Sequence, residues 1–239
     1  MNQNIVILHG WASKRARWEQ FKNKLGKQGF QVFLPSLPGF GQNKLVSSLS
    51  LGDYVKWFQK YLQQKDLSSF CLVGHSFGGS IAIKYASLRP KNLSKLVLVD
   101  SAGIRERFTL KKILFYILAK IGKLFFLIPP FCFLKRQAQI LLYTFIREKD
   151  YFKADKVMKE TLKKILKQDL RADLFKIKTP ALIVWGRDDK DTPLKHGYLL
   201  NQNIAGSRLV VYDGVGHGVP FKRTNQLIHE ITDFCQSKT

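Results

Sequence analysis

Cysteine is scarce in this chain of 239 residues, which contains only Cys71, Cys132 and Cys235. No two of them have the Cys-x-x-Cys spacing that is typical of zinc sites and redox-active dithiols. We therefore expect neither a disulfide framework nor a metal site. Sparse cysteine, and the absence of a basic leader before the first apolar run, predict a cytoplasmic protein without a signal peptide.

Acidic residues are also few. The 17 Asp and Glu stand against 40 Lys and Arg, which gives a net charge of +23. Such a charge is compatible with a nucleic-acid partner, with an anionic membrane or substrate, or with a solvated lysine-rich surface. Lysines outnumber arginines 29 to 11, and no nucleic-acid-binding module is recognisable. These observations favour the solvated surface and predict no nucleic-acid partner.

The sequence offers no run of about twenty uncharged, apolar residues, which a membrane-spanning helix needs. Residues 110–128 are strongly apolar, but they include four lysines and are followed by Pro129-Pro130, which stops a helix. We expect this stretch to be a helix that packs on the body of the protein. A helix that docks on lipid or lines an acyl-chain pocket is the alternative.

The rest of the chain alternates between short, β-branched apolar runs and helical patterns. Strands are predicted at about 4–8, 30–34, 69–73, 95–99, 181–185 and 208–212. Helices are predicted at about 16–27, 51–65, 77–88, 192–203 and 220–236. Because continuously apolar strands separated by helices are covered on both faces, we expect an α/β fold with a mostly parallel sheet of about six strands.

Residues 104–173 break this alternation, because about 70 residues pass without a strand pattern. The segment has helical character, with apolar clusters in its first half and many lysines in its second. We interpret it as a helical cap, or lid, inserted over the carboxyl edge of the sheet. Residues 1–103 and 174–239 then form the core, and residues 104–173 form the cap.

Residues 74–78 read Gly-His-Ser-Phe-Gly and join a predicted strand to a predicted helix. A Gly-x-Ser-x-Gly motif in this context is typical of a nucleophile elbow, a tight turn that exposes the serine hydroxyl. Ser76 is the candidate nucleophile. The backbone N–H of Phe77, at the start of a helix, is a candidate oxyanion-hole donor. A glycine-rich bend with an incidental serine is the alternative explanation.

A serine nucleophile needs a base and an acid that orients the base. His217 lies in a glycine-rich loop after the last predicted strand, at the sheet edge where parallel sheets carry their sites. The candidate acids also follow strands, and spacing alone does not rank them: they are Asp188, Asp189, Asp191 and Asp100. An acid after the strand at 181–185 gives the chain order serine, acid, histidine that is expected of this kind of site.

The loop after the first predicted strand reads His9-Gly10-Trp11. The backbone N–H of Trp11 is the candidate for the second oxyanion-hole donor, which would face that of Phe77 across the carbonyl oxygen. The indole of Trp11 has a separate interpretation as a wall of the pocket.

Five motifs, taken in order, resemble those of the α/β-hydrolase superfamily over essentially the whole chain. They are His9-Gly10-Trp11, Pro38-Gly39-Phe40-Gly41, residues 74–79, residues 185–189 with Pro193, and residues 214–217. The resemblance implies that Asp189 is the acid, because Pro193 then falls in register, with Asp188 as the fallback. It also implies oxyanion donors at Trp11 and Phe77, a cap inserted after the strand that ends near Asp100, and a short, six-stranded sheet.

The chain departs from the family pattern in several places. Ser36-Leu37-Pro38 stands where the family usually has Asp-x-Pro, and Asn43 where it usually has serine. A serine nucleophile differs from the aspartate of epoxide hydrolases and haloalkane dehalogenases. The Gly-Pro-Gly of the meta-cleavage carbon–carbon hydrolases and the corresponding loop of proline iminopeptidases are both absent after His9. The His-Gly-Trp sequence is similar to that of the biotin-pathway carboxylesterase, whose substrate is borne on an acidic carrier protein.

The sequence and the resemblance together predict a serine hydrolase that cleaves a small-molecule carboxylic ester through an acyl-enzyme, without a metal or organic cofactor. A lactone, a thioester or a carbon–carbon bond is an alternative substrate for the same triad. A binding protein for anionic membranes or an acidic carrier protein, acting through a basic cap, is the alternative outside catalysis. The oligomeric state is left open.

Overall fold

A computed structural model of the chain describes residues 3–105 and 155–237. Its centre is one sheet of six strands, all parallel, in the order β2-β1-β3-β4-β5-β6. The strands are β1 Asn4–Leu8, β2 Gln31–Phe33, β3 Phe70–His75, β4 Leu93–Val99, β5 Ala181–Gly186 and β6 Arg208–Tyr212. The expected α/β fold with a six-stranded parallel sheet is confirmed.

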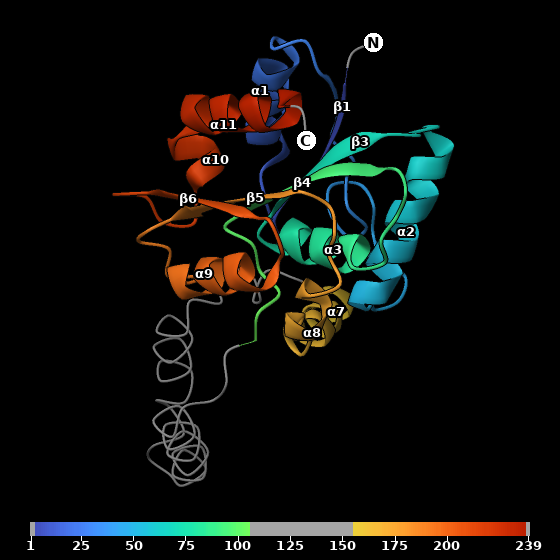
Figure 1. The fold of residues 1–239 in the computed structure, drawn as a ribbon. Coiled ribbons are helices and arrows are strands. Elements are labelled where there is room, and N and C mark those ends of the chain that lie inside the picture. The colour runs from blue at the N-terminus through green and yellow to red at the C-terminus, as the bar shows by residue number, and fades with distance from the viewer. Residues whose placement is uncertain (1–2, 106–154, 238–239) are drawn as a thin grey trace, which may run out of the picture.

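Helices cover both faces of this sheet (Figure 1). On one face lie α1 Arg15–Gly26, α10 Val219–Lys222 and α11 Thr224–Gln236, and on the other lie α2 Leu51–Gln64, α3 Phe77–Ala86 and α9 Leu194–Asn203. The short α8 Arg171–Leu174 contacts α3 and α9, and α7 Lys156–Leu166 lies beside it. The protein is therefore a three-layer sandwich.

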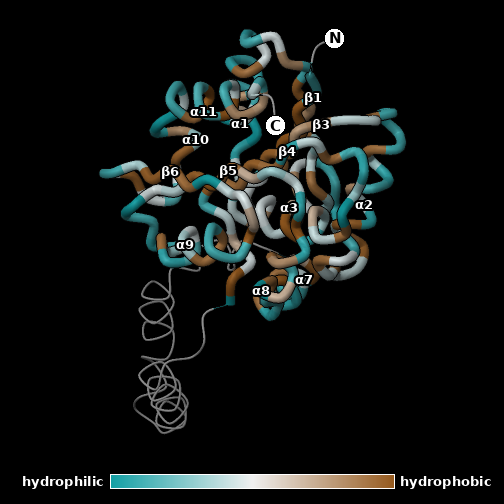
Figure 2. Tube along the Cα trace, viewed as in Figure 1, coloured by the Kyte–Doolittle hydropathy of each residue, from teal (hydrophilic) through white to brown (hydrophobic). Residues whose placement is uncertain are grey.

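The side chains of each strand alternate between two hydrophobic clusters, one on each face of the sheet. In β1, Ile5 and Ile7 belong to the cluster between the sheet and helices α1 and α11. Val6 and Leu8 belong to the cluster on the opposite face, between the sheet and helices α2 and α3. All four are fully buried, and Figure 2 shows the strands as hydrophobic segments inside the more polar helices. Burial on both faces explains why the strands read as continuous apolar runs.

The strand order reverses between β1 and β3, because the chain moves to one side of β1 to form β2 and then to the other side to form β3. In open α/β sheets, ligands bind outside the carboxyl ends of the strands at such a switch point. The His9-Gly10-Trp11 loop leaves β1 at this point, and the Ser76 turn leaves β3 beside it. The topology alone therefore brings these two motifs together.

One predicted helix is wrong in its extent. The chain at 220–236 was expected to be a single helix, but it forms α10 and α11, which are separated at Arg223. Arg223 has φ −127° and ψ 37°, which is outside the helical region. Nothing in the local pattern of apolar residues signals this break.

Residues 106–154, which make up most of the expected cap, lie outside the described residues. The part of the cap segment that is described contains α7 and α8 and no strand. The apolar stretch at 110–128 also lies outside the described ranges. None of the helices described in residues 3–105 and 155–237 is both long enough and apolar enough to cross a membrane.

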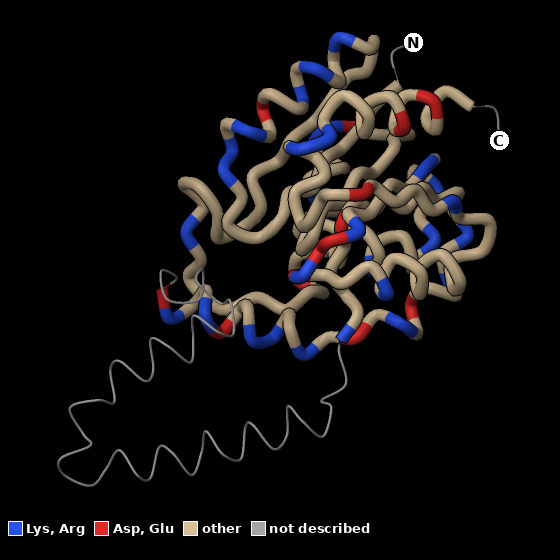
Figure 3. Tube along the Cα trace, turned by 90° about the vertical axis from the view of Figure 1, so that its left-hand side faces the viewer, with Lys and Arg blue, Asp and Glu red and all other residues tan. Residues whose placement is uncertain are grey.

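Figure 3 shows basic residues along many helices and loops, with acidic residues between them. One row follows α1 and its flanks, where Glu19 is the one acidic residue among Lys14, Arg15, Arg17, Lys22, Lys24 and Lys27. Glu19 pairs with Arg15 at 2.7 Å and approaches Lys22 at 3.8 Å. Both pairs are solvent-exposed, so each contributes at most about 1 kcal/mol to stability.

Candidate active site

Ser76 lies on a sharp turn between β3 and α3, in a backbone conformation that non-glycine residues rarely adopt. Its φ is 52° and its ψ is −118°, and its N–H donates to the Val99 carbonyl oxygen at 3.1 Å. The turn leaves no room for side chains on its flanks. A Cβ atom on Gly74 would lie 2.8 Å from the Gly78 carbonyl oxygen, and one on Gly78 would lie 2.0 Å from the Leu8 carbonyl oxygen. The glycines of the motif are therefore required by close backbone approach.

Ser76, His217 and Asp189 form a continuous hydrogen-bonded chain, although they come from the ends of three different strands. The Ser76 Oγ lies 2.8 Å from His217 Nε2, and His217 Nδ1 lies 2.8 Å from Asp189 Oδ2. Because an ionised carboxylate only accepts hydrogen bonds, Nδ1 carries the proton and Nε2 is free to accept from the serine. This is the arrangement that activates a serine nucleophile.

The pKa shifts of His217 and Asp189 suit a base and the acid that orients it. Burial lowers the pKa of His217, but the hydrogen bond and the negative charge of Asp189 outweigh burial and leave that pKa raised above its usual 6.5. Burial raises the pKa of Asp189, but the hydrogen bond and charge of His217 outweigh it and leave that pKa lowered. Asp189 is therefore ionised, and a carboxylate at this position favours the protonated form of His217.

The loop after β5 holds Asp189 rigidly. The N–H groups of Asp191 and Thr192 donate to Asp189 Oδ1 at 2.8 and 2.9 Å, and the Thr192 hydroxyl lies 2.7 Å from Asp189 Oδ2. Asp188, the fallback acid, is exposed, and its own N–H donates to the Val215 carbonyl oxygen at 2.9 Å. The structure thus brings Asp189 to His217 and leaves Asp188 in solvent.

Thr192 also belongs to the candidate site, although none of the sequence motifs indicates it. Its hydroxyl lies within hydrogen-bonding distance of Asp189 Oδ2, and also 3.2 Å from His217 Nδ1. One local signal could have found it, because Asp and Thr three residues apart in a loop commonly exchange side-chain and backbone hydrogen bonds.

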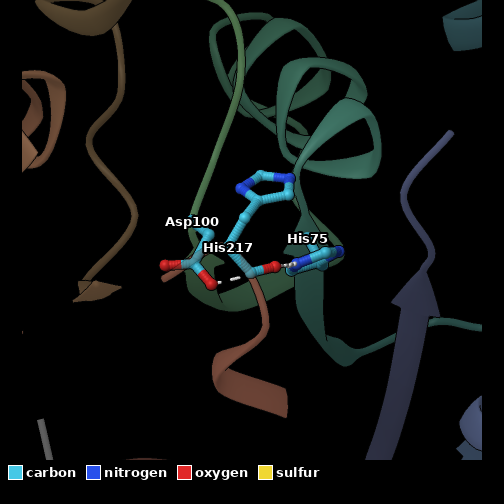
Figure 4. A group of neighbouring side chains, drawn as sticks. All are labelled: His75, Asp100 and His217. Atoms are coloured by element: carbon cyan, nitrogen blue, oxygen red, sulfur yellow. Dashed lines mark hydrogen bonds and ion pairs between the residues drawn. The ribbon is translucent and has the colours of Figure 1, made fainter. Parts of the chain in front are cut away.

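Two further titratable side chains lie behind the triad. Asp100 is fully buried at the end of β4, and His75 is buried at the end of β3. In Figure 4, both side chains face the backbone carbonyl of His217, whose imidazole ring points away from them. His75 Nε2 lies 3.4 Å from that carbonyl oxygen and 3.9 Å from Asp100 Oδ2.

His75 is unsuited to act as the base. Burial above all, and the nearby charge of His217, lower the pKa of His75 to about 3. Its imidazole is therefore neutral at physiological pH, and its Nε2 is directed at a carbonyl oxygen rather than at Ser76. We assign His75 to packing and to supporting the His217 loop.

The expected oxyanion-hole residues lie beside Ser76. A Cβ atom on Gly10 would lie 3.1 Å from Ser76 Cβ, so the chain that leads into Trp11 runs against the serine. The rings of Trp11 and Phe77 are in edge contact, with centroids 5.5 Å apart. Neither amide donates to a backbone carbonyl within residues 3–105 and 155–237. The two amides therefore stay the candidate oxyanion-hole donors.

Aromatic side chains surround this corner of the site. Trp11 meets Phe40 edge-on at a centroid distance of 4.9 Å, and Tyr54 meets Phe77 in the same way at 4.9 Å. The Tyr54 hydroxyl donates to the Pro38 carbonyl oxygen at 2.9 Å, which fixes the Pro38–Gly41 loop against α2. The site can therefore offer an apolar wall to the substrate next to the serine.

Two clusters among the residues that the structure describes have the composition of a metal site. Potential ligand atoms of His75, Asp100 and His217 lie within 4.8 Å of one another, and so do those of Asp189, Asp191 and His217. Both ring nitrogens of His217 already make hydrogen bonds, to Ser76 and to Asp189. A metal bound through His217 would have to break the Ser76–His217–Asp189 chain, so we assign these residues to hydrogen bonding.

Comparisons with known proteins agree with this architecture. The family described as alpha/beta hydrolase fold matches residues 3–141. The chain is 26% identical to the 2-hydroxy-6-oxo-6-phenylhexa-2,4-dienoate hydrolase of Comamonas testosteroni, over 98% of this chain and 88% of that protein. It is 28% identical to the AB hydrolase superfamily protein YisY of Bacillus subtilis, over 98% and 91% of the two chains. Among solved structures, an esterase from Exiguobacterium antarcticum superposes with a TM-score of 0.75 at 24% identity, over 99% of this chain and 92% of that one.

Proposed function

The chain belongs to the alpha/beta hydrolase fold family, and from this premise we propose that it is a serine hydrolase that cleaves carboxylic esters through an acyl-enzyme. The observation that carries the proposal is the pair of 2.8 Å contacts that join Ser76 to His217 and His217 to Asp189. A nucleophile, a base and an orienting acid in this geometry are the requirements of acyl transfer.

In the first half of the proposed reaction, Ser76 Oγ attacks the ester carbonyl carbon while His217 Nε2 takes the hydroxyl proton. The carbonyl oxygen becomes an oxyanion, which accepts hydrogen bonds from the N–H groups of Trp11 and Phe77. The negative charge of Asp189 stabilises the imidazolium form of His217. The tetrahedral intermediate then collapses, and His217 gives its proton to the departing alcohol.

In the second half, water enters and the same groups act again. His217 removes a proton from the water as it attacks the acyl carbon, and the two amides hold the second oxyanion. Collapse of this intermediate breaks the bond to Ser76 Oγ, which regains its proton from His217. The carboxylic acid leaves, and no metal or organic cofactor takes part in the proposed cycle.

Hydrolysis of a carbon–carbon bond is the second candidate. It is favoured by the 26% identity over 98% of the chain with a hydrolase named for 2-hydroxy-6-oxo-6-phenylhexa-2,4-dienoate. The same serine and histidine could serve it, with a carbon leaving group in place of an alkoxide. Lactones and thioesters require only a different leaving group on the same acyl carbon. The remainder of the proposed cap, residues 106–154, would select among these substrates.

The test is hydrolysis of p-nitrophenyl acetate and butyrate by the wild type, Ser76→Ala and Ser87→Ala. Ser87 is a matched control because it lies at the far end of α3, where its hydroxyl donates to the Lys84 carbonyl oxygen. We expect Ser76→Ala to lose turnover and Ser87→Ala to keep it. Turnover by a folded Ser76→Ala would overturn the proposal. Parallel assays with 2-hydroxy-6-oxo-6-phenylhexa-2,4-dienoate compare the two candidates, and a higher kcat/KM for the dienoate than for any ester would favour the second.

A further inference from the structure

Asp100 is a buried carboxylate that the proposed chemical steps leave without a role. It follows β4 directly, its side chain is fully buried, and its φ is 43°, in the left-handed region that non-glycine residues seldom occupy. Strained backbone and an ionisable group in the interior both cost stability, so their combination calls for an explanation in function.

The carboxylate of Asp100 binds the two loops that carry the acid and the base. Its Oδ1 accepts the N–H of Gly186, which ends β5 just before the Asp189 loop, at 2.9 Å. Its Oδ2 accepts the N–H of Val219, two residues after His217, at 3.2 Å. These amides are far apart in the sequence, and Asp100 joins them through one planar group.

The backbone of Asp100 makes two more contacts with the acid-bearing segment. Its N–H donates to the Val184 carbonyl oxygen at 3.0 Å, and its carbonyl oxygen lies 3.1 Å from the Thr192 hydroxyl. Thr192 in turn donates its N–H to Asp189 Oδ1, and its one hydroxyl proton is shared between the Asp100 carbonyl oxygen and Asp189 Oδ2. The supports of Asp189 and of His217 therefore meet at Asp100.

We propose that Asp100 is a positioning residue for the triad, which holds the Asp189 loop and the His217 loop in the relative placement that the serine chemistry needs. The inference rests on the proposed function of Ser76, His217 and Asp189. Asp100 acts through the loops rather than on the substrate, so its loss should lower kcat much more than it changes KM.

Only the ionised carboxylate of Asp100 can accept both hydrogen bonds, from Gly186 and from Val219, at full strength. A proton on either oxygen weakens that oxygen as an acceptor for its amide. Three titratable groups lie near enough to Asp100 to influence its charge: His75 from the end of β3, Asp189 from the loop after β5, and His217 from the loop after β6. Burial, with a smaller contribution from the charge of Asp189, raises the pKa of Asp100 to about 7, although the Gly186 amide opposes the shift. Both Asp100 and His217, whose own pKa is raised above 6.5, are therefore mostly protonated well below pH 6.

The experiment compares Asp100→Asn with Asp213→Asn in ester hydrolysis. Asp213 is a matched control, since it also follows a strand directly but is exposed and pairs with Arg187 on the surface. Asn keeps one acceptor oxygen and turns an NH₂ group toward the other amide. We expect kcat to fall on the order of 10- to 100-fold in Asp100→Asn, with KM changed less than about twofold, and both parameters to be unchanged in Asp213→Asn. An unchanged kcat in a folded Asp100→Asn overturns the proposal, and so does a loss that appears in KM alone.

The pH dependence of kcat/KM distinguishes an Asp100 that positions the triad from an Asp100 that only packs in the interior. Below pH 6, log kcat/KM of the wild type should fall with a slope approaching 2, because both His217 and Asp100 must lose a proton, and Asp100→Asn should show a slope of 1. A wild-type slope of 1 contradicts the proposal, and this test holds even where the variant does not fold. Wild-type turnover that Ser76→Ala abolishes shows that the proposed function stands, so a failure of the Asp100 test is then specific to Asp100.

Discussion

Asp189 Oδ2 lies 2.8 Å from His217 Nδ1, across the sheet edge formed by the ends of β5 and β6. The contact fixes the tautomer of the histidine and leaves its other nitrogen facing Ser76. The neighbouring Asp188 is exposed and takes no part in it. Adjacent aspartates in one loop thus have opposite environments, and the difference between them can be measured.

Replacing Asp189 by Asn should lower kcat on the order of 10³- to 10⁴-fold, because an amide in place of the carboxylate no longer stabilises the imidazolium and favours the wrong tautomer. Asp188→Asn, the matched control, should stay within about twofold of the wild type because its side chain is solvated. Steady-state ester hydrolysis by both purified variants is the measurement. The opposite ranking would move the acid to Asp188.

The pH dependence of the Asp189 variant gives a second test. The proposed mechanism requires neutral His217 and ionised Asp100, so wild-type activity should be lost as the pH falls and both groups take up a proton. Asp189 keeps the pKa of His217 above 6.5. Removing the negative charge of Asp189 lowers that pKa. The residual activity of Asp189→Asn should therefore persist to lower pH than that of the wild type, as measured by kcat/KM from pH 5 to 9. An acid limb at the same pH in both proteins would mean that Asp189 does not set the pKa of His217.

Thr192 offers a test of how Asp189 is held. Thr192→Val keeps the shape of the side chain but removes the hydroxyl that lies 2.7 Å from Asp189 Oδ2. We expect a loss of about 0.5–1.5 kcal/mol in the free energy of unfolding, because Asp189 Oδ2 keeps its contact with His217 but loses a second donor, together with a lower kcat. Thr192→Ser keeps the hydroxyl and should restore most of kcat. Chemical denaturation and ester kinetics measure the two effects, and a Ser variant as impaired as the Val variant would show that the methyl group, not the hydroxyl, matters.

Gly78→Ala tests the packing of the nucleophile turn against β1. The added Cβ would lie 2.0 Å from the Leu8 carbonyl oxygen, so backbone must move apart. We expect the free energy of unfolding to fall by about 1–3 kcal/mol or more, with activity lost. Gly26→Ala is the matched control, because a Cβ there, in α1, meets nothing within 4 Å. It should be neutral or stabilising by up to about 1 kcal/mol. Equal thermal stability of the two variants would contradict the close approach of this turn to β1.

Much of the fold follows from local sequence. Strands buried on both faces must be apolar throughout, and this is why β1, β3 and β5 could be recognised from short runs without any partner in view. The separation of α10 from α11 could not be recognised, because it depends on the backbone of Arg223 and not on the spacing of apolar residues.

The parts of the candidate site that lie at the ends of strands could be predicted from the sequence. Ser76 and His217 follow strands of a parallel sheet, and such ends share one edge, so their meeting is a consequence of topology. The choice between Asp188 and Asp189 required either the family register or the structure. Asp100 could be named as a candidate acid but not as a support, because its partners Gly186 and Val219 lie 86 and 119 residues away in the sequence.

The most direct test of the proposed nucleophile is covalent labelling with a small fluorophosphonate, followed by intact mass and peptide mapping. We expect one adduct per chain, located on Ser76, no adduct in Ser76→Ala, and much slower labelling in His217→Ala because the hydroxyl is no longer activated. Labelling of the wild type at another residue, or equal rates in the wild type and His217→Ala, would contradict the assignment of Ser76 as a nucleophile activated by His217.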